Sequence, residues 1–99
     1  MPHSRDKRID DAIRAYGQLV NDHPGEAEYL SARAAARVYL AAALSDAGRY
    51  DDEIGAYRRA VEDYTLLLTA VPDVPRYREN LAITRTNLGQ TLHRYRDAK

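Results

Sequence analysis

The chain of 99 residues contains no cysteine, no tryptophan and no phenylalanine, and it has a single methionine. Without cysteine it can form neither a disulfide nor a thiolate metal site. Its aromatic residues are eight tyrosines. An aromatic core must therefore be built from tyrosine rings, whose hydroxyl groups need a polar partner or a wet edge.

The sequence also lacks an imbalance of charge and a long apolar run. The formal net charge is zero, 30% of the residues are charged and the mean hydropathy is −0.64. No stretch approaches the roughly 20 apolar residues that a membrane span needs, and Met1 to Asp10 is too polar for a signal peptide. We expect a single cytoplasmic domain over residues 1–99, without membrane contact. Arginines gather late in the chain, but arginine is common on solvated helix faces, so no nucleic-acid partner is expected.

Motifs that carry chemistry are missing as well. None of the histidines (His3, His23 and His93) lies four residues from another histidine or a glutamate. The acidic run from Asp51 to Glu53 opens a predicted helix, where carboxylates stabilise free N–H groups, and we prefer this role to metal binding. The sequence shows no Ser-His-Asp arrangement and no glycine-rich phosphate loop. We expect a protein that is not an enzyme and has no cofactor.

The stretch from residue 40 to residue 60 predicts a helix, a tight turn and a second helix. Apolar side chains recur at steps of three and four on both sides of Gly48. Glycine adopts the left-handed conformation that often ends a helix, so Gly48 should end the first helix. Two apolar stripes joined by so short a turn should pack antiparallel as an αα-hairpin.

The same reasoning predicts four helices in the whole chain, near residues 5–22, 26–47, 51–70 and 76–96. Pro24 and Gly25 separate the first two helices, and Pro72 and Pro75 separate the last two. No alternating apolar stretch bounded by turn residues indicates a strand. The fold class is therefore all-α.

An internal repeat with a period of 48 residues relates the two halves of the chain. Matching positions include both proline breaks and the apolar stripes, which packing would constrain. The repeat relates Tyr16 to Tyr64, Leu19 to Leu67, Pro24 to Pro72, Tyr29 to Tyr77, Ala34 to Ala82, Arg37 to Arg85, Leu40 to Leu88, Ala41 to Gly89 and Leu44 to Leu92. Self-similarity at a fixed period is typical of solenoids.

A set of residues in these helices resembles the tetratricopeptide repeat (TPR) family. The set consists of Leu40, Ala41, Gly48, Tyr50, Tyr57, Ala60, Leu88 and Gly89. In that family a large and a small residue stand side by side in helix A, a Gly-x-Tyr turn follows, and alanines flank an aromatic residue in helix B. The resemblance implies an α-solenoid of antiparallel hairpins, with Ala41 and Gly89 at close helix crossings.

The chain departs from the family pattern in three respects. Its period is 48 residues, against about 34 in the family, so each helix gains about two turns. Glu53 occupies the place of a helix B alanine, where a long acid should loosen the contact or point outward. The chain begins with a helix B and ends with a helix A, and the lengthened form is similar to repeats in large multidomain bacterial proteins. We therefore expect a fragment of a longer scaffold.

The resemblance also implies a groove lined by the helix A positions, the second and fourth helices. The residues placed there are Val38, Ala42, Ser45, Thr86, Gln90, His93 and Arg94. Some family members hold a peptide carboxylate with a lysine and an asparagine at two of these places. This sequence has Val38 and Ala42 there, so that activity is not supported. A helix or an extended peptide would still fit.

The expected function is a non-catalytic module that binds a protein or peptide partner. The alternative is a structural element that stacks or dimerises through its terminal helices as a homo-oligomer, or whose four helices close into a discrete four-helix bundle. The terminal apolar residues should be only partly covered by the rest of the chain. They are Ile9, Ile13, Tyr16, Leu88, Leu92 and Tyr95.

Overall fold

The computed structural model describes the backbone of residues 2–98 and the side chains of residues 7–97. Four helices follow one another: α1 (Pro2–Asp22), α2 (Ala27–Asp46), α3 (Tyr50–Ala70) and α4 (Pro75–Ala98). No residue from 2 to 98 lies in a strand. The all-α prediction is confirmed. The first helix begins at Pro2, earlier than its expected start near residue 5.

The turn after α2 is closed by a glycine in the left-handed conformation. Gly48 has a φ of 72° and is the only residue of the described chain with a positive φ. The Arg49 N–H donates to the Leu44 carbonyl at 2.9 Å, and the Gly48 N–H donates to the Ser45 carbonyl at 3.0 Å. These two bonds form a Schellman motif, which satisfies carbonyls that the helix end would leave free. The predicted role of Gly48 as a helix stop is confirmed.

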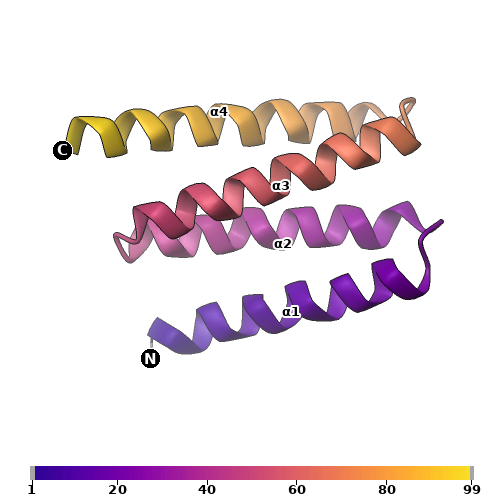
Figure 1. Cartoon of the computed structure of the whole chain (residues 1–99), viewed down its shortest axis with the longest axis horizontal. Coiled ribbons are helices and arrows are strands. Elements are labelled where there is room, and N and C mark those ends of the chain that lie inside the picture. Colours follow the sequence, from indigo (N-terminus) through magenta and orange to yellow (C-terminus); the bar gives the residue numbers. More distant parts are fainter. Residues whose placement is uncertain (1, 99) are drawn as a thin grey trace.

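The helices form a row in the order of the sequence (Figure 1). The principal contacts join α1 with α2, α2 with α3, and α3 with α4. The resulting body measures 42 × 28 × 16 Å. Serial packing of this kind favours a stack of hairpins, although the four-helix bundle alternative is also compatible with the all-α fold.

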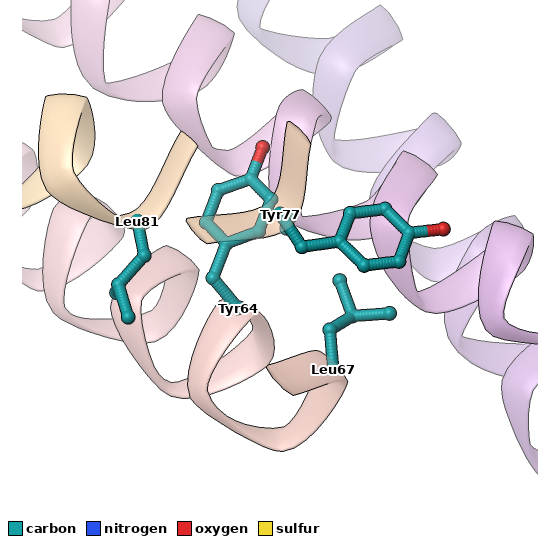
Figure 2. Close-up of a cluster of buried hydrophobic side chains, with 5 residues drawn as sticks. Tyr64, Leu67, Tyr77 and Leu81 are labelled. Carbon is teal, nitrogen blue, oxygen red and sulfur yellow. The ribbon is translucent and has the colours of Figure 1, made fainter. Parts of the chain in front are cut away.

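The centre of the row is the contact between α3 and its two neighbours. One cluster of buried residues contains Ala34, Tyr64, Leu67, Tyr77 and Leu81. Figure 2 shows Tyr64, Leu67, Tyr77 and Leu81 within this cluster. The second cluster contains Ala41, Leu44, Ala56 and Tyr57. Burying one large apolar side chain contributes about 1.5–3 kcal/mol, so these clusters are the main apolar support of the fold, and tyrosine supplies their aromatic rings as expected.

Small residues allow α2 and α3 to approach closely. Ala34, Ala41 and Ala60 have no exposed surface. The prediction that Ala41 lies at a close contact agrees with this burial. The matching prediction for Gly89 is wrong within this chain, because Gly89 is exposed and a Cβ atom there would meet no atom within 4 Å. Within residues 2–98, no helix covers that side of α4.

None of the helices, as far as the chain is described, is long and apolar enough to cross a membrane.

Candidate functional site

A buried carboxylate on α3 holds α2 in place. The Asp63 side chain is 2% exposed and accepts hydrogen bonds from two arginines. Arg33 donates through Nε at 3.1 Å and through Nη2 at 2.9 Å, and Arg37 donates through Nη1 at 2.8 Å. Bidentate arginine–carboxylate pairs fix both distance and orientation. Asp63 therefore fixes the register of α3 against α2.

Glu53 forms a second buried polar contact, between α3 and α4. Its side chain has no exposed surface, so the expectation that Glu53 points outward is wrong. Thr91 donates to Oε2 at 2.8 Å, and Arg94 donates to the same oxygen at 3.3 Å. The other oxygen, Oε1, has no hydrogen-bond partner in the structure. Glu53 is turned inward because Thr91 supplies a buried hydroxyl on the facing helix.

The two buried carboxylates affect neighbouring tyrosines. Burial, and secondarily the charge of Asp63, raises the pKa of Tyr64 above its ordinary value. Burial, and secondarily the charge of Glu53, raises the pKa of Tyr57. Both phenols therefore remain neutral at pH 7, and the core contains tyrosine as an uncharged ring.

Sequence reasoning missed Asp63, although the sequence contained a signal for it. Ala56, Ala60, Asp63 and Leu67 follow one another at steps of four, three and four on α3. This spacing places the acid inside the buried stripe. Arg33 and Arg37 lie four residues apart, on one side of α2. An acid in one apolar stripe and a pair of arginines in the facing helix together predict a buried ion pair.

The structure brings together two of the residues expected to line a groove. Arg94 on α4 donates to the Ser45 hydroxyl on α2 at 3.5 Å. Val38 is half-buried and packs against both core clusters. Ala42 and Gln90 are exposed. Binding in a groove between α2 and α4 stays a prediction for these residues.

The remaining expected groove residues make contacts within α4. The Thr86 hydroxyl donates to the carbonyl of Ala82 on its own helix at 3.0 Å. His93 lies 3.2 Å from Asp97 through Nε2 and 3.0 Å from Arg96 through Nδ1. It lines an open hollow on α4 with Gly89, Leu92, Tyr95 and Arg96.

The expected repeat-packing residues differ in how far they are buried by a neighbouring helix. Tyr57 and Ala60 are buried and Leu40 is half-buried. Tyr50 meets Tyr95 edge to face, with ring centroids 6.2 Å apart. Leu88, on the last helix, is half-buried and packs against the second core cluster.

One side of α4 has no helix packed on it among the residues that the structure describes. We call this side the α4 outer face, and it consists of Arg78, Ala82, Arg85, Gly89 and Leu92, all exposed. Each of these residues lies 48 positions after a residue of α2 that is buried or half-buried: Leu30, Ala34, Arg37, Ala41 and Leu44. Leu44 is 4% exposed, whereas its counterpart Leu92 is 38% exposed. The α4 outer face is thus the counterpart of the α2 surface that α3 covers.

A hollow of about 290 Å³ is lined by residues of α1, α2 and α3. Its charged lining is mixed, with Asp10 and Arg59 among its residues. Arg37 is bonded to Asp63 and Arg49 to Asp52. In the part of the chain that is described, no group of three His, Asp or Glu residues is arranged to hold a metal ion.

Comparison of the chain with protein-family models, with curated proteins and with solved structures finds no match. The functional argument therefore rests on the geometry of the chain itself.

Proposed function

We propose that this chain is a non-catalytic protein-interaction module built from TPR-like helical hairpins. The observation that carries the proposal is the α4 outer face. The counterpart residues on α2 pack against α3, whereas the residues of the α4 outer face are exposed. A surface already shaped for helix packing binds a protein or peptide partner with little rearrangement.

The terminal helices give further support. Ile9, Ile13 and Tyr16 on α1 are half-buried, as are Leu88 and Tyr95 on α4. Leu92 is exposed. The prediction that these terminal residues are only partly covered is thus confirmed, and incompletely covered apolar residues mark interaction surfaces when they are contiguous.

Self-assembly is the second candidate, and the repeat favours it. By position α1 is the counterpart of α3, since Tyr16 matches Tyr64 and Leu19 matches Leu67. The α1 helix of a second copy would therefore occupy the place on α4 that α3 has on α2, although it has Ala15 at the position of Asp63. Such a head-to-tail contact would extend the row from one copy to the next.

A displayed library of random peptides, selected on the immobilised chain, tests the proposed function. We expect enriched peptides that bind the native chain saturably and bind Leu92→Glu more weakly. Leu66→Glu is the matched control, because Leu66 is another exposed leucine, 56% exposed on α3. Enrichment no greater than on an unrelated helical protein would overturn the proposal.

Light scattering over a concentration series tests the second candidate. Growth in mass with concentration, abolished by Leu92→Glu and not by Leu66→Glu, would support assembly through α4. A constant monomer mass would remove self-assembly and leave the partner-binding proposal in place.

A further inference from the structure

We infer that the α4 outer face binds an amphipathic helix that presents small residues and one carboxylate, in the way that α3 binds α2. The inference rests on the proposed function and names the chemistry of the partner. Three observations carry it: the construction of the α2–α3 contact, its repetition on α4, and the charge of the uncovered arginine.

The α2–α3 contact combines small residues with one ion-pair cluster. Ala34 and Ala41 on α2 and Ala60 on α3 are fully buried. Small residues at such positions let two helix backbones approach closely. Between them, Asp63 on α3 accepts from Arg33 and Arg37 on α2. A helix that fits α2 therefore needs small side chains and a carboxylate at the Asp63 position.

The α4 outer face repeats the α2 side of this contact. Ala82, Gly89 and Leu92 on α4 are the repeat counterparts of Ala34, Ala41 and Leu44 on α2, each 48 positions later. Glycine in place of alanine permits a still closer approach. A Cβ atom at Gly89 would meet nothing within 4 Å, so the space that α3 occupies over Ala41 is open over Gly89.

The charge of the face specifies the partner further. Arg85 is the counterpart of Arg37, and Leu81 replaces the second arginine, Arg33. Arg78 adds another exposed positive charge to the face. Covering an arginine with an apolar helix is costly unless a carboxylate pairs with it. The partner helix must therefore bring an acidic residue opposite Arg85.

The α1 helix of a second copy does not meet this requirement. At the position of Asp63 it has Ala15, and at the position of Ala56 it has Arg8. Packed on α4, it would leave Arg85 opposite alanine and bring Arg8 near an already basic surface. The occupant is therefore a helix with the pattern of α3, with Asp or Glu where α3 has Asp63, and not the chain's own first helix.

A peptide with the α3 sequence, Tyr50–Ala70, is a direct probe of this face. It is labelled with a fluorophore and stapled across positions 58 and 62, whose side chains are exposed on α3. Titration with the full chain, followed by fluorescence anisotropy, should give saturable binding. Arg85→Glu in the chain should weaken binding roughly tenfold, the scale of a lost charge pair. Arg14→Glu, an exposed arginine on α1, should leave binding unchanged.

Charge reversal distinguishes a direct contact from general electrostatics. The peptide carrying Asp63→Arg should bind the native chain poorly and bind the Arg85→Glu chain better than the native peptide does. Gly89→Leu in the chain should abolish binding while helicity by circular dichroism is kept, because the larger side chain blocks the close approach and a Cβ atom at this position meets no atom within 4 Å.

Three outcomes would overturn the inference: no saturable binding up to about 1 mM peptide, binding that Arg85→Glu leaves unchanged, or binding that Gly89→Leu leaves unchanged. If the displayed library still yields peptides that bind the native chain, the proposed interaction function stands and only the inferred α3-like occupant is wrong. If both experiments fail, the proposed function fails as well.

Discussion

At the scale of single residues, the two buried carboxylates on α3 differ in how well their charge is compensated. Asp63 accepts three hydrogen bonds from two largely buried arginines. Glu53 accepts from one hydroxyl and from Arg94, whose side chain is 54% exposed, and its second oxygen has no partner. A buried charge contributes to stability only where its surroundings replace the hydration that it has lost.

Conservative amide substitutions should expose this difference. We expect Asp63→Asn to lower the free energy of unfolding by about 2–3 kcal/mol, because two largely buried arginines lose their counter-charge. Glu53→Gln should change it by less than about 1 kcal/mol, because the lost charge was poorly compensated. Urea unfolding followed by circular dichroism measures both. Equal losses would show that the two carboxylates are equivalent, against the contacts described above.

The buried tyrosines predict a loss of stability in alkali. Their pKa values are raised in the folded state, above an ordinary value of 10.0. Each therefore contributes stability that is complete below pH 10 and is lost as the pH rises toward the folded pKa, because the unfolded chain releases the phenolic protons first. Stability measured between pH 9 and 12 should fall less steeply in the Tyr57→Phe, Tyr64→Phe double variant.

At the scale of helices, the same repeat position has opposite packing in α2 and α4. Ala41 is fully buried, whereas its counterpart Gly89 is exposed. Ala41→Leu should overpack the α2–α3 contact and cost roughly 1–3 kcal/mol. Gly89→Leu should stabilise the isolated chain by about 0.5–1 kcal/mol, because leucine is the better helix former and Gly89 is exposed, with no atom within 4 Å of an added Cβ. Thermal melting of the two variants tests both predictions. A shift of the two melting temperatures in the same direction would contradict them.

Helix limits and turns could be predicted because their causes are local. Gly48 ends α2 through bonds to residues only three to five positions away. The burial of Glu53 could not be predicted in this way, because its hydrogen-bond partner Thr91 lies 38 positions further along the chain. Gly89 was misjudged for a related reason: whether a helix position is buried depends on a neighbouring helix, and the described helices leave that side of α4 uncovered. The groove residues were placed by resemblance, and among the described residues the bond from Arg94 to Ser45 joins two of them across α2 and α4.

At the scale of the whole molecule, serial packing predicts an order of local stability. The outer helices α1 and α4 each have one principal neighbour, whereas α2 and α3 each have two. Regions with fewer buried contacts open more easily. Hydrogen exchange should therefore protect the amides of α2 and α3 most strongly. Equal protection of all four helices would favour the closed four-helix bundle.

The row also determines how the chain responds to tension. A pull on its two ends loads the outermost helices (Figure 1), so α1 or α4 separates from its single principal neighbour while the other contacts stay intact. The inner hairpin, where Arg33 and Arg37 hold Asp63, carries the load last. Extension then proceeds in steps of one helix at a time, and a helix bound on α4 adds a further contact that must separate before α4 itself is released.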